Sequence, residues 1–174
     1  KAFGMAETAQ SIQMTEQTIF DCASLTKIVA TTSSVLLLLE RGQLDLDDAI
    51  SDYFPSLKQQ HKEVKIHHLL THTSGFQEGI KFYKKQIAYT EVVEYIAQLT
   101  HRNAINKKVI YSDINYILLG ILIEKVANAS LADYAEKNIF QPLGMQHTQF
   151  NPPAELQGKI AATEYRDYLK QHQW

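Results

Sequence analysis

The chain has 174 residues, 45% of them hydrophobic, which is enough for a globular domain with a core and excludes a disordered tail. Its 17 basic and 19 acidic side chains are spread along the whole length and leave a net charge of -2, so no basic patch predicts binding to nucleic acid. No apolar run approaches the roughly 20 residues of a membrane-spanning helix, and the single cysteine excludes an internal disulfide framework or a thiolate metal cluster.

The N-terminal part of the chain divides into a β-prone stretch and a helical one. Residues 3–20 mix polar and β-prone side chains, and we expect two short strands there. From Ser24 onward, apolar residues recur at three- and four-residue spacing until Gly42, which predicts a largely buried helix of about five turns. Two shorter helices are expected next, one over residues 45–54 and one over residues 66–71.

Capping residues and apolar runs mark three longer helices in the second half of the chain. Thr90 caps the first, Asp113 precedes a strongly apolar one that ends near Asn128, and Ser130 caps one that stops before Pro142. No linker, repeat or low-complexity run separates these helices, so we expect no domain boundary between them. Because an isolated hairpin is marginal in water, the N-terminal strands need covering helices or further strands.

The tetrapeptide Ser24-Leu25-Thr26-Lys27 stands where the helical pattern begins. Three-residue spacing on a helix puts Ser24 and Lys27 on one face, so the amine can reach the hydroxyl. The free N–H groups and positive dipole end at the start of a helix also favour the oxyanion that forms when a serine attacks a carbonyl. The pattern by itself is weak, since a helix cap beside a solvated lysine has the same residues.

A second polar cluster, Tyr111-Ser112-Asp113, directly precedes the strongly apolar helix. A structural interpretation has Asp113 as a helix cap and Tyr111 as a packing aromatic, without any chemistry. Each of the two clusters lies at the start of a long buried helix, however. They could therefore face one another across a cleft on which their polar groups converge.

Four segments together resemble one known family. They are residues 20–27 (FDCASLTK), 69–75 (LLTHTSG), 111–116 (YSDINY) and 140–145 (FQPLGM), in the order and spacing of class C β-lactamases, D-alanyl-D-alanine carboxypeptidases and related penicillin-binding-protein-like esterases. The resemblance implies a β-lactamase/transpeptidase-like α+β fold, here mostly its helical domain with a few N-terminal strands of an incomplete antiparallel sheet. It also implies Ser24 as the acylated nucleophile, Lys27 as its proton partner, and Tyr111 as the residue that passes a proton to the leaving group.

The chain departs from the family pattern at Asp113, where an asparagine is usual. An ionised carboxylate only accepts hydrogen bonds, so Asp113 changes how this position would bind the substrate's amide carbonyl. A carboxylate near Lys27 also favours the ammonium form of that side chain. We therefore expect the general-base role to move towards Tyr111, and the preference among substrates to move from β-lactams towards esters or peptides.

A second departure concerns the family's third motif, a Lys- or His-x-Gly on a strand, which does not occur before Trp174. We therefore expect a fragment, with a single partial β-lactamase-like domain over residues 1–174. In it, sheet strands occupy residues 1–20, residues 21–174 are mainly helical, and N- and C-terminal sheet elements are missing. Low turnover is expected of such a piece, because one side of its cleft would be absent.

The expected function is hydrolysis through an acyl-enzyme on D-alanyl peptides, β-lactams or small esters, with no metal or organic cofactor. The alternatives are a catalytically silent module that binds or senses the same ligands, and a plain helical interaction protein. Expected partners are a small-molecule or peptidoglycan-peptide substrate, with no nucleic acid and no membrane span, and an exposed sheet edge would permit a homodimer. The compartment stays open, with the cell envelope or extracellular space favoured over the cytoplasm.

Two weaker signals are interpreted as structural. His68 and His72 are four residues apart, but Leu69 stands where a zincin has its glutamate, so no metal site is predicted. His72 and Ser74 are instead expected to satisfy backbone groups in a turn. Cys22, close to the candidate nucleophile, is expected to be a small buried hydrophobe.

Overall fold

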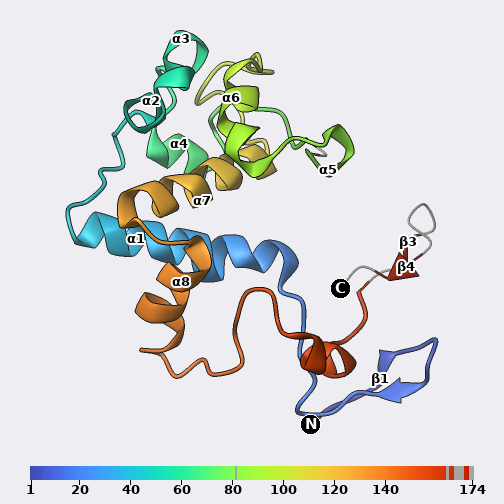
Figure 1. Ribbon diagram of the computed structural model, residues 1–174. Coiled ribbons are helices and arrows are strands. Elements are labelled where there is room, and N and C mark those ends of the chain that lie inside the picture. The colour runs from blue at the N-terminus through green and yellow to red at the C-terminus, as the bar shows by residue number, and fades with distance from the viewer. Residues whose placement is uncertain (81, 164, 167–170, 173–174) are drawn as a thin grey trace.

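A computed structural model describes residues 1–80, 82–163, 165–166 and 171–172. Most of the described chain forms a helical body, and a β-hairpin lies apart from it near the N-terminus (Figure 1). Strand β1 (Met5–Glu7) pairs antiparallel with β2 (Ile12–Gln13), and β3 (Tyr165–Arg166) pairs antiparallel with β4 (Gln171–His172). The two strands expected in residues 3–20 are confirmed, as is the mostly helical α+β architecture with a small antiparallel sheet.

The first long helical run has three parts. It consists of a 3-10 turn η1 (Ala23–Leu25), a π-helical segment η2 (Lys27–Thr32) and the helix α1 (Ser33–Glu40), and Gly42 follows at φ +66°. The Ser33 hydroxyl donates a hydrogen bond of 3.0 Å to the Ile28 carbonyl. A side chain thus hydrogen-bonds a backbone carbonyl of the π-helical segment. The helical run predicted from Ser24 to Gly42 is confirmed, but its first half is not an ideal α-helix. The expectation that it is largely buried is wrong, because only 28% of the residues in Ala23–Glu40 are buried.

The segments between this run and the second long helix are short. They are α2 (Ile50–Tyr53), η3 (Pro55–Leu57), α3 (Lys58–His61), α4 (Ile66–Leu70), α5 (Phe82–Lys85), η4 (Tyr89–Glu91) and α6 (Val92–Ala97). The helix predicted over residues 66–71 is therefore confirmed to within one residue.

Two expected helix starts in this region are wrong. Residues 45–49 form turns instead of helix, because the Asp45 and Asp48 carboxylates each accept a local backbone hydrogen bond of 2.8 Å. Such side-chain bonds give the backbone an alternative to the helical ladder. Thr90 lies inside η4, whose N-cap is Ala88, and the Glu91 carboxylate accepts from the Ala88 amide at 3.3 Å.

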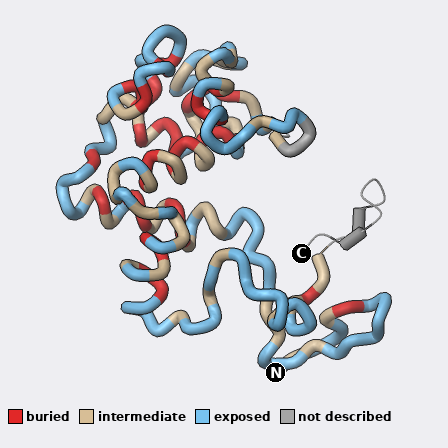
Figure 2. The backbone as a smooth tube through the Cα atoms, viewed as in Figure 1, coloured by how far each residue is buried: buried red, intermediate tan, exposed pale blue. Residues whose placement is uncertain are grey.

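Helix α7 (Asp113–Ala127) runs through the main hydrophobic core. Leu118, Leu119 and Leu122 are fully buried in it, and each contributes roughly 1.5–3 kcal/mol by burial. The helix ends at Asn128, which adopts the left-handed conformation at φ +51°. Figure 2 shows that buried positions gather around this helix, whereas the hairpin is largely exposed.

Helix α8 (Leu131–Ala135), the π-helical η5 (Glu136–Phe140) and the 3-10 segment η6 (Ala154–Lys159) complete the described helices. Ser130 caps α8 as predicted, since its hydroxyl accepts from the Asp133 amide at 3.0 Å. The segment after η6 returns to the N-terminal part of the chain, where the Ala161 amide donates to the Ile19 carbonyl at 2.8 Å. Residue 161 is thus tied to the segment that follows the N-terminal hairpin.

By length and composition alone, the helical run Ala23–Glu40 could span a membrane. Its 18 residues have a mean hydropathy of 1.3, and 28% of them are buried. Core helices that never meet a bilayer pass the same test, as does the bent pair of Asp113–Ala127 and Leu131–Phe140, whose axes differ by 74°. The run packs on α7 and α8, and we interpret it as a core helix of this fold.

Candidate active site

Ser24 occupies an exposed position in the 3-10 turn at the start of the first long helical run. The residue before it, Ala23, has φ +42°, a conformation that non-glycine residues seldom adopt. The Asp21 carboxylate accepts a hydrogen bond from the Ala23 amide at 2.7 Å and helps to hold this conformation. Backbone strain of this kind clusters at functional sites, and no pattern in the sequence revealed it.

Lys27 connects the two predicted clusters. Its Nζ donates to the Ser24 Oγ at 3.2 Å and lies 2.8 Å from the Asp113 Oδ1. The amine also lies over the Tyr111 ring, 5.0 Å from its centroid, and 5.9 Å from the centroid of the Tyr116 ring. The structure therefore brings Ser24, Lys27, Tyr111 and Asp113 together, although more than eighty residues separate the two pairs.

The exposures of these groups differ. The Lys27 side chain is 15% exposed, whereas that of Asp113 is 57% exposed. Burial lowers the pKa of Lys27, but hydrogen bonds and charge interactions with Asp113 and Tyr111 outweigh it, so that this pKa lies above its ordinary value. The site therefore holds Lys27 as an ammonium at neutral pH.

The pKa of Tyr111 is lowered, which makes its phenolate form easier to reach. Hydrogen bonding to Ser24 and then to Lys27 lowers the pKa of Tyr111, and burial and the charge of Asp113 oppose this only in part. A phenolate is negative, so a nearby ammonium and hydroxyl donor stabilise it. The phenol thus loses its proton more readily than an isolated tyrosine does.

Backbone hydrogen bonds hold the Tyr111 segment in place. The Asp113 amide donates to the Glu78 carbonyl at 2.7 Å, and the Ile110 amide donates to the His72 carbonyl at 2.9 Å. Ser112, the N-cap of α7, is fully buried, and its hydroxyl donates to the Gln77 carbonyl. Asp113 is therefore the first residue of α7 rather than its cap, and its carboxylate is free to pair with Lys27.

Three further residues, His72, Asn115 and Tyr116, surround the site, although the sequence did not predict a role for them there. His72 packs against the rings of Tyr111 and Tyr116, with centroid distances of 4.7 and 5.1 Å. Asn115 is fully buried and donates from its Nδ2 to the His72 Nδ1 at 3.1 Å. The motif that carries His72 was visible in the sequence, but its contact with residues 111–116 is tertiary.

The structural interpretation of the histidine segment is confirmed, and that of Cys22 is wrong. The Ser74 hydroxyl accepts from the Phe76 amide at 3.3 Å, and His72 accepts from the Ser112 amide at 3.1 Å. Helix α4 ends before His72, so His72 does not share a helix face with His68. Cys22 is exposed, at the N-cap position before the 3-10 turn η1. Within the described ranges, no group of three or more His, Cys, Asp or Glu side chains could hold a metal ion.

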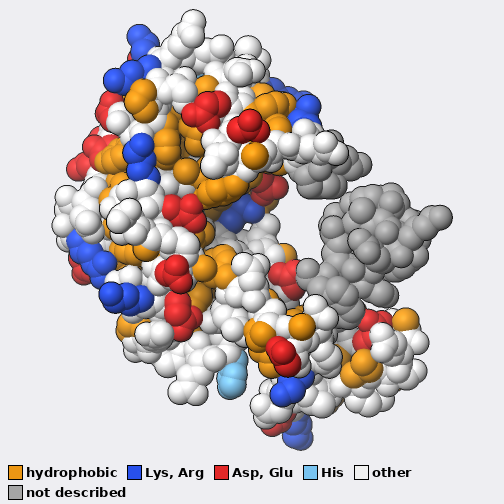
Figure 3. Space-filling view, in the orientation of Figure 1, with side chains coloured by type: hydrophobic (Ala, Val, Ile, Leu, Met, Phe, Trp, Pro, Cys, Tyr) orange, Lys and Arg blue, Asp and Glu red, His pale blue; other side chains and the backbone are white. Residues whose placement is uncertain are grey.

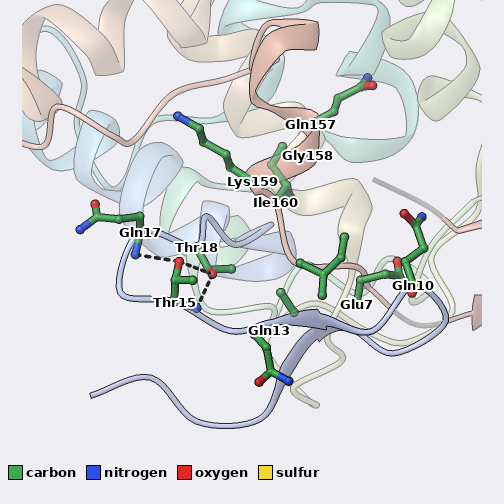
Figure 4. Close-up of a pocket in the computed structure, with 12 residues that line it drawn as sticks. Glu7, Gln10, Gln13, Thr15, Gln17, Thr18, Gln157, Gly158, Lys159 and Ile160 are labelled. Carbon is green, nitrogen blue, oxygen red and sulfur yellow. Dashed lines mark hydrogen bonds between the residues drawn. The ribbon is translucent and has the colours of Figure 1, made fainter.

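One pocket lies apart from these residues. It measures about 420 Å³ and lies between the N-terminal hairpin and residues 157–160, where the Thr15 and Thr18 hydroxyls lie 3.2 Å apart (Figure 4). Neither Ser24 nor Tyr111 lines it. Figure 3 shows this face of the molecule hollowed between the helical body and the part that carries the hairpin, with hydrophobic side chains along the hollow.

Comparisons with known proteins agree with the resemblance in the sequence. Proteins of Salmonella heidelberg and Salmonella typhimurium, both named "Putative D-alanyl-D-alanine carboxypeptidase", are 32% identical over 187 residues, which cover 94% of this chain and 43% of theirs. The chain thus spans less than half the length of these relatives. A class C β-lactamase structure superposes with a TM-score of 0.79 at 29% identity, covering 92% of this chain and 44% of that one.

A β-lactamase/D-alanine carboxypeptidase from Pseudomonas syringae has the same fold, with a TM-score of 0.81 at 23% identity over 99% of this chain and 48% of that one. The β-lactamase family model matches residues 1–173. Family model, sequence relatives and structures therefore lead to one assignment, and the chain belongs to the β-lactamase family.

Proposed function

We propose that this chain carries the nucleophile of a serine hydrolase that acts through an acyl-enzyme. The observation that carries the proposal is the position of the Lys27 Nζ, 3.2 Å from the Ser24 Oγ and 2.8 Å from the Asp113 Oδ1. An ammonium at this place polarises the serine hydroxyl and stabilises negative charge on its neighbours. The names of the relatives, β-lactamases and D-alanyl-D-alanine carboxypeptidases, support the same reaction class.

In the proposed first step, the Tyr111 phenolate takes the proton of the Ser24 hydroxyl while the Oγ forms a bond to the substrate carbonyl carbon. The carbonyl electron pair moves to oxygen, where the positive end of the helical run that starts at Ala23 stabilises it. When the carbon–heteroatom bond breaks, the Tyr111 hydroxyl returns the proton to the leaving group. Water then attacks the ester at Ser24 and releases the acid.

Lys27 acts in this proposal as a fixed cation rather than as the base. An ordinary lysine is already almost wholly protonated at pH 7, and the site raises the pKa of Lys27 further. Asp113 contributes to this increase because it pairs with the ammonium form. Tyr111 has the opposite environment and is the better candidate for the base.

Substrates are proposed to be D-alanyl peptides, β-lactams or small esters. Asp113 tilts the preference from β-lactams towards esters and peptides, because a carboxylate at this position accepts hydrogen bonds but does not donate them. A second candidate function is a silent module that binds such ligands without turnover. It follows if Lys27 has to accept the serine proton, because the site keeps Lys27 charged.

Covalent labelling tests the proposal. The chain is treated with a fluorophosphonate and, separately, with a penicillin, and intact mass is measured. We expect one adduct on Ser24, lost in Ser24→Ala and retained in Ser56→Ala, a matched control because Ser56 is also an exposed serine within a 3-10 turn. Binding of penicillin by calorimetry without any mass gain would favour the silent module. If penicillin neither binds nor adds mass, and the fluorophosphonate adds none, both candidate functions are overturned.

A further inference from the structure

His72 holds an unusual backbone conformation directly beneath the candidate active site. It follows α4 with φ +58°, in the left-handed region where histidine is tolerated better than most residues. Its carbonyl accepts from the Ile110 amide at 2.9 Å, and its ring accepts from the Ser112 amide at 3.1 Å. His72 therefore forms hydrogen bonds with the residues directly before and directly after Tyr111.

The hydrogen bonds around His72 determine where its ring carries a proton. The Ser112 backbone amide is only a donor, so the Nδ1 that faces it must be unprotonated. Asn115 then presents its Nδ2 to the same Nδ1 at 3.1 Å, and its Oδ1 accepts from the Ser74 hydroxyl at 2.6 Å. One backbone amide thus fixes the tautomer of His72 and the orientation of the Asn115 amide.

The surroundings of the ring favour its neutral form. Burial lowers the pKa of His72, the charge of Lys27 lowers it further, and Asp113 acts in the opposite direction. The other ionisable groups that face the ring are the phenols of Tyr111 and Tyr116, whose rings pack against it. A proton on Nδ1 would point at two donors and place a second cation beside Lys27.

We propose that His72 is a positioning residue, which holds Tyr111 over Lys27 through an unprotonated Nδ1 that accepts from Ser112 and Asn115. This inference rests on the proposed function, in which Tyr111 exchanges the proton of the nucleophile. When His72 takes up a proton in acid, the Ser112 amide loses its acceptor and the segment that carries Tyr111 moves. Acylation then falls although Ser24 itself is unchanged.

The first test uses nuclear magnetic resonance on the chain with nitrogen-15 labelling. We expect the His72 ring at neutral pH to carry its proton on Nε2, with Nδ1 unprotonated. The Ser112 amide signal should shift with the same midpoint as the ring, below about 6.5, the ordinary histidine value. A proton on Nδ1 at neutral pH would overturn the inference, as would a Ser112 amide signal that does not shift when His72 titrates.

The second test compares two variants in the rate of Ser24 labelling by a fluorophosphonate. His72→Asn keeps an acceptor near the position of Nδ1 and suits the left-handed backbone, so its labelling rate should stay within about threefold of the wild-type rate. The decrease of the rate in acid that is due to His72 should disappear in this variant. His72→Ala leaves the Ser112 amide without its side-chain acceptor, and its rate should fall ~10-fold or more. His147→Asn, at an exposed histidine, serves as the matched control.

Equal losses in His72→Asn and His72→Ala would show that the ring itself, and not its acceptor, is needed, and would refute the inference. Unchanged labelling in His72→Ala would refute it as well. If the wild-type chain takes no label, the proposed function fails, but the tautomer of His72 still decides the inference about positioning. Thermal melts of both variants show whether either one is unfolded.

Discussion

Replacement of Asp113 by asparagine tests the electrostatics of the site. The Lys27 Nζ and the Asp113 Oδ1 are 2.8 Å apart, and the Asp113 side chain is 57% exposed. Because water reaches the carboxylate, we use the dielectric constant of water, for which two unit charges at this distance interact by about 1.5 kcal/mol. The pKa of Lys27 should therefore fall when the carboxylate becomes neutral, because Asp113 raises it.

The pKa of Tyr111 responds in the same direction, because the charge of Asp113 raises it. The pH–rate profile of acylation in Asp113→Asn should therefore move to lower pH, by less than about one unit, because Asp113 is the weakest of the influences on the pKa of Tyr111. On its rising limb, the rate should increase by less than about tenfold. Stability should change by less than about 1 kcal/mol, as for other exposed ion pairs.

The assay is the rate of Ser24 labelling by a fluorophosphonate between pH 5 and pH 10, followed by intact mass. Asp52→Asn is the matched control, since Asp52 is an exposed aspartate on α2, remote in sequence from the site. A profile for Asp113→Asn that coincides with the wild type would show that the carboxylate does not tune the base. The assignment of Asp113 as a group that raises the pKa of Tyr111 would then be abandoned.

Three further predictions concern the base and the stability of the fold. Lys27→Arg should label at a reduced but measurable rate if the charge matters, whereas labelling as slow as in Lys27→Ala would point to a neutral lysine as base. Leu118→Ala should cost about 2–5 kcal/mol in denaturant unfolding because the side chain is fully buried, while Leu36→Ala, at a residue that is 55% exposed, should cost far less. Burial lowers the pKa values of His61 and His101. As pH falls, the unfolded chain therefore binds more protons than the folded chain does. The contribution of this pair to the free energy of unfolding is full above about pH 6.5 and declines below that pH. Melting temperatures should show this decline, and His61→Asn should make it shallower; an equally steep decline in that variant would exclude the pair as its cause.

Local signals in the sequence predicted much of the fold. Gly42 and Asn128 end helices in the left-handed conformation, and Ser130 caps a helix, because each of these roles depends on a single residue and its immediate neighbours. Prediction was wrong where side chains compete with the backbone. Asp45 and Asp48 look like helix starters, but together they close a turn.

The site was only partly within reach of the sequence. The three-residue spacing of Ser24 and Lys27 is local, and helical geometry alone brings them together. Tyr111 and Asp113 join them through tertiary packing, which the resemblance to a family implied but no spacing could show. The role of His72 depends on its contact with the Ser112 amide, forty residues away, so no local pattern distinguishes it from an ordinary turn histidine.

The order in which the site groups lose protons supports the proposal that Tyr111 is the base. Isolated tyrosine and lysine side chains have similar pKa values, about 10 and about 10.4. In this site the pKa of Tyr111 is lowered and that of Lys27 is raised, so Tyr111 deprotonates first as pH rises. A deprotonated Lys27 would also leave the Asp113 carboxylate without its partner and remove one of the charges that keep His72 neutral. The same ammonium therefore supports the Tyr111 phenolate and the unprotonated His72 ring, and a mechanism with Lys27 as base would forfeit both.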